Sequence, residues 1–342
     1  MGGWRPTPPP PVAARICAGR PGGRPTDAGP GRRPWEARLR TGAARSPRLL
    51  IAGLGVLLVL AGLSCSATDA GIPPWEKVWS DSFNGPADSS INTRYWEYNT
   101  GRGIFGTGEI ETMTASRHNV HLDGRGHLDL VVLGHGSGSS RDYAWTSARV
   151  ETKSSRFAAP AGGEMMVTAS IRQPDAAHEL GYWPGFWMLG PQAWPMDGEI
   201  DIMEDVNGLN QHSGTLHCGN LTQRNHDGSF GPCHETDGLG SGSRTCAGCQ
   251  RGFHTYSVIV DRRHATDQQI RWYFDGHEFF SVSERRVGQA VWTAAVDHGF
   301  SILLNVSMGG SFPNAQCRCT TPTSQTSSQG TMVVQYIDVY TN

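Results

Sequence analysis

Three carboxylic acids, Glu199, Asp201 and Glu204, lie close together in the sequence. On a regular strand the side chains alternate between faces, so Glu199 and Asp201 share one face while Glu204 points the other way. A β-bulge near Ile202 or Met203 would return Glu204 to the face of the other two. Hydrolysis of a glycosidic bond needs two carboxyl groups that converge on one bond, so this segment is a candidate catalytic strand.

Flat aromatic side chains precede these acids in residues 181–187. Trp183 and Trp187 offer surfaces on which sugars stack, although a core position explains either one equally well. The competing interpretation of the acids is a solvated strand face or a calcium site. Three carboxylates on one face repel each other, and such a local cost is more often kept at a functional site than elsewhere.

The elements that would position these residues are short strands. Alternating or β-branched stretches separated by Gly, Asn and Asp predict strands over the ranges 76–83, 127–133, 147–152, 164–171, 254–261, 269–274 and 332–340. Asp275-Gly276 predicts a two-residue hairpin, and residues 288–295 predict a short helix. The pattern is typical of an all-β sandwich or barrel that forms one domain over residues 75–342.

The beginning of the chain has a different composition. Residues 1–44 are basic and rich in Pro and Gly, which predicts a disordered leader or a start codon placed too far upstream. Residues 45–67 combine a basic flank, the short apolar run 49–63 and small residues, as a secretory signal peptide does. We therefore expect a secreted protein. The alternative is a membrane anchor through residues 49–63 or a lipid on Cys65.

Charge and cysteine content agree with export. The chain has 29 basic and 31 acidic residues, and without the ten arginines and two acids of residues 1–48 it carries 19 and 29. An acidic domain argues against nucleic acid as a partner. Six cysteines follow residue 200, and an even number in an exported domain predicts disulfides. We expect Cys218 to pair with Cys233 and the other four to tie the 246–249 and 317–319 loops, with a zinc site at Cys246 and Cys249 as the alternative.

Several segments together resemble glycoside hydrolase family 16. Residues 199–204 resemble the signature of its bulged, laminarinase-like form, and residues 105–114, 119–130, 183–188 and 303–313 resemble its other strands in the right order. The likeness covers residues 75–342. It implies a β-jelly-roll of two curved antiparallel sheets with a cleft on the concave face, and an endo-acting β-1,3-glucanase. Residues 105–109 and 218–252 depart from the usual pattern, and the second of these predicts a disulfide-pinned loop over one end of the cleft.

The resemblance also implies roles for individual residues. Glu199 would be the nucleophile, Glu204 the general acid and then the general base, and Asp201 the hydrogen-bonding residue between them. His217 and Glu109 would line the cleft beside the two tryptophans.

No catalytic cofactor is implied, but a structural calcium near Asp81 and Asp338 is. We expect a monomer that acts on a polysaccharide and keeps no stable membrane partner after signal cleavage. The alternatives are the same chemistry on mixed-linked β-1,3-1,4-glucan or β-galactan, or a non-catalytic β-glucan-binding protein.

Overall fold

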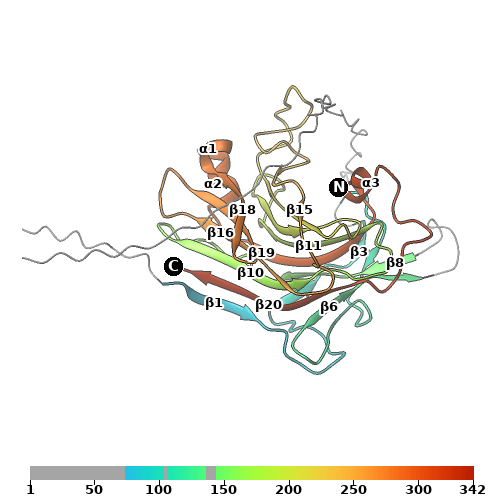
Figure 1. Ribbon diagram of the computed structural model, residues 1–342. Helices are drawn as coiled ribbons and strands as arrows, with labels where there is room; N and C mark the ends of the chain where they lie inside the picture. The colour runs from blue at the N-terminus through green and yellow to red at the C-terminus, as the bar shows by residue number, and fades with distance from the viewer. Residues whose placement is uncertain (1–73, 104–105, 136–143) are drawn as a thin grey trace, which may run out of the picture. The chain divides into compact units, whose positions relative to one another are not determined.

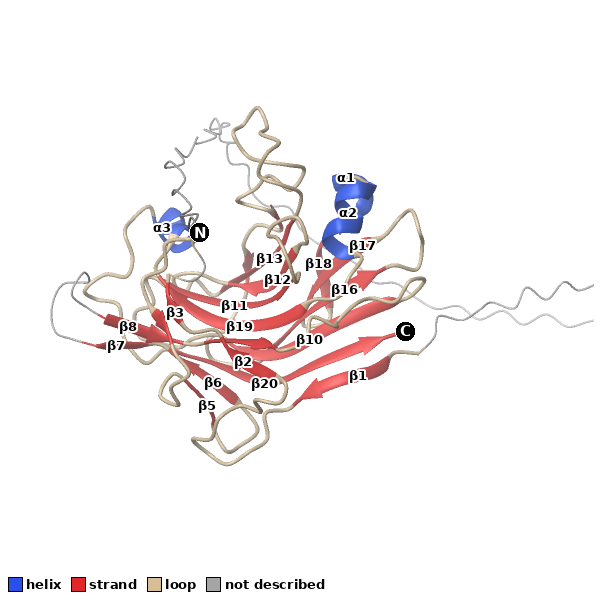
Figure 2. Ribbon diagram, turned by 180° about the vertical axis from the view of Figure 1, so that it is seen from behind, coloured by secondary structure: helices blue, strands red, loops and turns tan. Residues whose placement is uncertain are grey.

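Two curved antiparallel sheets stack on each other in the computed structural model, which describes residues 74–103, 106–135 and 144–342 (Figures 1 and 2). The first sheet contains, in spatial order, β18 (His277–Ser283), β17 (Gln269–Phe274), β16 (His254–Asp261), β10 (Glu164–Arg172), β20 (Thr331–Thr341), β6 (Leu128–Val131) and β5 (Val120–Leu122). The strand β1 (Glu76–Asp81) also pairs with β20.

The second sheet carries the acidic strand. Its order is β14 (Leu239–Gly240), β13 (Gln211–His217), β12 (Glu199–Glu204), β11 (Tyr182–Leu189), β19 (Ser301–Met308), β9 (Arg149–Thr152) and β2 (Trp96–Tyr98), and β15 (Arg244–Thr245) pairs with β13. A small third sheet joins β3 (Gly101–Arg102), β4 (Thr112–Met113), β8 (Ala144–Ser147) and β7 (Leu133–His135).

Alternation in the second sheet separates the core from an open face. On β11, Tyr182, Phe186 and Met188 are fully buried between the sheets, as side chains two residues apart on one face should be. Trp183 and Trp187 leave the strand on the opposite face, beside the acids of β12. The segment between β13 and β16, yellow to gold in Figure 1, rises over that open face.

Three short helices complete the described residues: α1 (Glu284–Val287), α2 (Gln289–Val296) and α3 (Ser311–Cys317). The helix α2 confirms the short helix predicted over residues 288–295. Asp275 and Gly276 both have positive φ, as the predicted hairpin between β17 and β18 requires. None of the helices among these residues is long and apolar enough to cross a membrane. The predicted leader (1–44) and signal peptide (45–67) lie outside the described residues.

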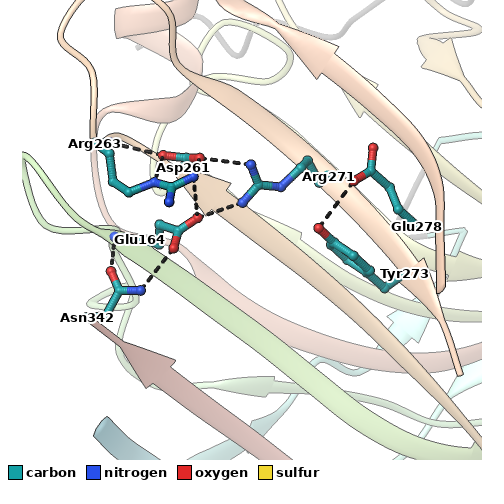
Figure 3. Close-up of polar contacts among 7 residues, drawn as sticks. All are labelled: Glu164, Asp261, Arg263, Arg271, Tyr273, Glu278 and Asn342. Atoms are coloured by element: carbon teal, nitrogen blue, oxygen red, sulfur yellow. Dashed lines mark hydrogen bonds and ion pairs between the residues drawn. The ribbon is translucent and has the colours of Figure 1, made fainter. Parts of the chain in front are cut away.

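An ionic network connects β10, β16 and β17 of the first sheet with Asn342, the last residue of the chain (Figure 3). The Glu164 carboxylate lies 2.6 Å from the Arg271 guanidinium and 3.3 Å from that of Arg263. Asp261 accepts from the same two arginines. The Asn342 side-chain amide donates to Glu164 at 2.9 Å. These contacts hold β10, β16 and β17 in register beneath the second sheet.

Candidate active site

The three acids of β12 share the open face because of a bulge. Between Asp201 and Glu204 two residues of β12 oppose only Gly214 of β13, so the register slips there by one residue. The pairing with β11 slips at the same point. Glu199 and Asp201 share a face by ordinary alternation, and the bulge returns Glu204 to it. The bulge predicted from the odd spacing of the acids is therefore confirmed.

Trp272 of the first sheet supports the bulge from below. Its indole N–H donates to the carbonyl oxygen of Asp201 at 2.7 Å, and the side chain is fully buried. A Cβ atom on Gly214 would lie 2.4 Å from the Trp272 ring, so only glycine permits this approach. The inter-sheet contact thus sets the backbone that aims the acids.

The two glutamates differ in the groups that face them. Burial and then the charge of Asp201 raise the pKa of both Glu199 and Glu204. Two cations, His217 and Arg149, oppose this rise at Glu199. At Glu204 the rise is opposed by a hydrogen bond from the Trp183 indole at 2.8 Å and by the charge of His217. The Arg149 charge is therefore what distinguishes the two glutamates, because it favours ionisation at Glu199 and is not among the groups that act on Glu204.

His217 lies at the centre of the acidic cluster. Its Nε2 lies 3.4 Å from the Asp201 carboxylate and 4.0 Å from that of Glu199. Its Nδ1 lies 2.7 Å from the carboxylate of Glu235, a residue of the loop after β13. Burial alone would lower the pKa of His217, but the contacts with Asp201 and Glu235 raise it well above its usual value. Glu199, Asp201 and His217 lie close enough together to hold a metal ion, but the pairing of His217 with Asp201 accounts for this spacing without one.

The predicted aromatic residues occupy different settings. Trp183 is partly exposed, stands edge-on to Phe312 of α3 and donates to Glu204, so it contacts the candidate acid directly. Trp187 is only 8% exposed, and its indole donates to Asn305 at 2.7 Å. The Arg149 guanidinium lies 4.8 Å from the centre of the Trp187 ring. Little of Trp187 remains for sugar stacking, so the structure argues against its predicted role as a platform.

Glu109 lies at the wall of the same face. It pairs with Gly309, just after β19, and its side chain is buried and accepts a hydrogen bond from the Thr107 hydroxyl. It also acts electrostatically on Arg149, as Glu199 does. The structure therefore brings Glu109 near the cluster through Arg149, and its place in a cleft wall stays a prediction.

Sequence reasoning missed four residues of this site. Arg149 and Asn305 come from neighbouring strands, Glu235 comes from the disulfide-bonded loop, and Trp194 lies 5.7 Å from the His217 ring with 40% of its surface exposed. A signal existed for Glu235 alone, because it follows Cys233, whose expected partner Cys218 is adjacent to His217. Trp194 is the most open aromatic surface beside the cluster among the described residues.

The cysteines form disulfides. Cys218 bonds to Cys233, which confirms the one pair that was predicted, and the other four cysteines pair as Cys246–Cys249 and Cys317–Cys319. The first bridge pins the loop that carries Glu235. Pairing of Cys246 with Cys249 removes both thiolates of the alternative zinc site.

The predicted calcium ligands do not converge. Asp81 pairs with Ile337 and Asp338 with Ser80, so the two acids leave the β1–β20 pair on opposite faces. The Lys77 ammonium lies 2.7 Å from the Asp338 carboxylate, and Asp81 accepts from the Trp96 indole at 2.8 Å. These partners do not fit one shared calcium ion, and we assign none to the pair.

Comparisons with known proteins agree with this geometry. Residues 133–253 match a family described as the XgeA-like catalytic domain of glycoside hydrolase family 16. The chain is 42% identical to the endo-1,3-beta-glucanase of Streptomyces sioyaensis, whose crystal structure superposes with a TM-score of 0.71 over 80% of this chain and 99% of that one. The endo-beta-1,3-glucanase of Pyrococcus furiosus is 27% identical, with a TM-score of 0.60 over 78% and 94% of the two chains.

A curated relative covers a similar span. The beta-glucanase of Rhodothermus marinus is 29% identical over 302 residues, which are 83% of this chain and 92% of that protein. The Streptomyces similarity extends over nearly the whole of that enzyme, and the two-sheet fold with its acidic strand is the jelly-roll expected from the sequence. The chain therefore belongs to glycoside hydrolase family 16, in its laminarinase-like group.

Proposed function

We propose that this protein is a secreted endo-β-1,3-glucanase that cleaves its substrate with retention of configuration. The observation that carries the proposal is the bulged strand β12, which gathers Glu199, Asp201 and Glu204 on one face next to His217. The names of the Streptomyces and Pyrococcus enzymes support β-1,3-glucan as the substrate.

The residues would act in two steps. Glu199 attacks the anomeric carbon while Glu204 gives its proton to the departing glycosidic oxygen, which leaves a glycosyl ester on Glu199. Glu204, now ionised, then removes a proton from water, and the water attacks the same carbon and releases Glu199. Asp201, held between the two glutamates and facing the His217 ring, modulates which of them carries the proton. No cofactor takes part in either step.

The roles of the two glutamates follow from their surroundings. Arg149 and His217 favour the ionised form of Glu199, which a nucleophile needs. Burial and the charge of Asp201 raise the pKa of Glu204, and Arg149 is not among the groups that act on it, which suits a group that must hold a proton. Glu204→Ala should regain activity with azide and yield a β-glycosyl azide, since the nucleophile remains. An α-glycosyl azide would mean inversion and would overturn the assignment.

Export is supported by two independent features. Residues 45–67 have the pattern of a signal peptide, and six cysteines of the domain pair as three disulfides. Disulfides persist in oxidising compartments. Expression of the full chain in its native host should place the enzyme in the culture medium with its N-terminus close to residue 68. Retention in the membrane fraction would favour the anchored alternative.

The substrate is tested by product analysis of residues 68–342 on laminarin, curdlan, barley β-glucan, lichenan and β-1,3-galactan. Oligosaccharides from laminarin and curdlan are expected. Short stretches resemble proteins named endo-1,3(4)-beta-glucanase, at 51% identity over 39 residues in one case, so products from barley β-glucan would broaden the specificity. Products from β-1,3-galactan alone would show that the substrate is a β-galactan and not a β-glucan. Binding to a glucan without any product would favour a non-catalytic glucan-binding protein.

A further inference from the structure

A second carboxylate lies directly behind His217. The Glu235 side chain is fully buried, and its Oε2 lies 2.7 Å from Nδ1 of His217. Its Oε1 accepts the backbone N–H of Cys218 at 2.8 Å. The other nitrogen of the ring, Nε2, faces Asp201 at 3.4 Å. The imidazole thus bridges a carboxylate of the loop and a carboxylate of the catalytic strand.

This bridge constrains the state of the ring. An ionised carboxylate only accepts hydrogen bonds, so a neutral imidazole can donate to one of the two neighbours but not to both. A protonated ring donates from both nitrogens and satisfies both. Glu235 itself is closed off from solvent behind the ring, so it cannot contact a sugar, and any effect on the reaction passes through His217.

Two features of the fold hold Glu235 next to His217. The Cys218–Cys233 disulfide begins next to His217 and ends two residues before Glu235. Gly238 then passes close to the ring edge with a positive φ, and a Cβ there would lie 2.9 Å from Cε1 of His217. The loop is therefore fitted to the imidazole and not merely adjacent to it.

The groups around His217 are mostly acidic. Glu199, Asp201 and Glu204 face it from β12, and Glu235 faces it from the loop. Its flanking strand β14 consists of Leu239 and Gly240 and adds no charge. Trp194 covers part of the ring and is neutral. The His217 ring thus lies among four carboxyl groups.

We propose that Glu235 is a positioning residue that holds His217 as an imidazolium turned toward Asp201, and thereby helps to keep Glu199 ionised for attack. The effect on catalysis rests on the proposed function, whereas the effect on His217 does not. Burial alone would lower the pKa of His217, but the contacts with Asp201 and Glu235 raise it, which agrees with this role. Removing the Glu235 charge should lower the pKa of His217, and the weaker positive charge should then raise the pKa of Glu199.

The test uses Glu235→Gln in residues 68–342, because glutamine keeps the shape and the acceptor for Cys218 but loses the charge. Titration of His217 by ¹⁵N NMR should show its midpoint lower by about 1–3 pH units. The acidic limb of kcat/KM on laminarin should move to higher pH by up to about one unit. Asp227→Asn is the matched control, because it removes an exposed carboxylate from the same loop that pairs with His234 instead.

An unchanged His217 midpoint in Glu235→Gln would overturn the proposal. If that variant does not fold, Glu235→Asp, which keeps the charge on a shorter side chain, and Cys218→Ala/Cys233→Ala take its place. The double variant should lower the His217 midpoint, while Cys317→Ser/Cys319→Ser, which removes a bridge from another loop, should not. Equal midpoints in the two disulfide variants would also contradict the role. If the His217 midpoint falls in Glu235→Gln but the parent enzyme hydrolyses none of the glucans, the proposed function is refuted, while the role of Glu235 toward His217 is retained.

Discussion

The substitution Gly214→Ala tests how the fold aims the catalytic acids. The new methyl group would lie 2.4 Å from Cδ1 and 2.7 Å from Nε1 of Trp272. Trp272 is fully buried and packs against Phe280, so it has no room to retreat. The methyl group must therefore displace either the indole, with its hydrogen bond to Asp201, or the bulge itself.

The expected cost has two parts. Forcing an extra methyl group into a packed core costs about 1–3 kcal/mol. Loss of the hydrogen bond from Trp272 to the Asp201 carbonyl adds about 1 kcal/mol. The free energy of unfolding should therefore fall by about 2–4 kcal/mol. Under conditions where the variant is still folded, kcat/KM should fall about 100-fold, because a displacement near 1 Å misaligns the acids.

Urea unfolding of the variant and the parent measures the first effect, and initial rates on laminarin measure the second. Gly240→Ala on the adjacent strand is the control, since its Cβ would lie no closer than 3.5 Å to Thr215. This control should stay within about 0.5 kcal/mol of the parent. If Gly214→Ala has the stability and activity of the parent, the account of the bulge is refuted.

Three further predictions concern the site and its support. Trp183→Phe removes the hydrogen bond that opposes the raised pKa of Glu204, so that pKa should rise further and the basic limb of the pH–rate profile should move to higher pH; an unmoved limb would contradict the contact. Trp194→Ala should raise KM for laminarin oligosaccharides about 3- to 10-fold with little change in kcat, if its exposed indole carries a sugar; an unchanged KM would exclude that role. Glu164→Gln leaves the guanidinium groups of Arg263 and Arg271 with one charge fewer between them, so urea unfolding should show a loss of about 2–3 kcal/mol with no change in the pH–rate profile; parental stability would mean that the network contributes nothing net.

Local patterns predicted those parts of the fold that depend on neighbours in sequence. The odd spacing of Glu204 from Glu199 was enough to predict the bulge, because strand periodicity fixes which residues share a face. Asp275-Gly276 predicted its hairpin for the same kind of reason: both residues tolerate positive φ. The strands β16 and β17 begin and end where the alternating stretches do.

Contacts between distant segments could not be predicted in this way. Arg149 comes to Glu199 through the pairing of β9 with β19, which no local pattern encodes. The arginine also lies over the Trp187 ring, which leaves little of that ring open to a sugar. Asp81 and Asp338 do lie on paired strands, but a one-residue offset in register sends them to opposite faces.

The most direct test of the proposed mechanism is covalent trapping of the nucleophile. The enzyme would be incubated with an activated 2-deoxy-2-fluoro-β-laminaribioside, digested with protease and sequenced by mass spectrometry. The mechanism predicts one glycosyl ester, on Glu199, and slow return of activity as the ester is hydrolysed. A label on Glu204 or Asp201 would contradict the mechanism. So would hydrolysis of the reagent without inactivation of the enzyme, with the α-anomer as the first product.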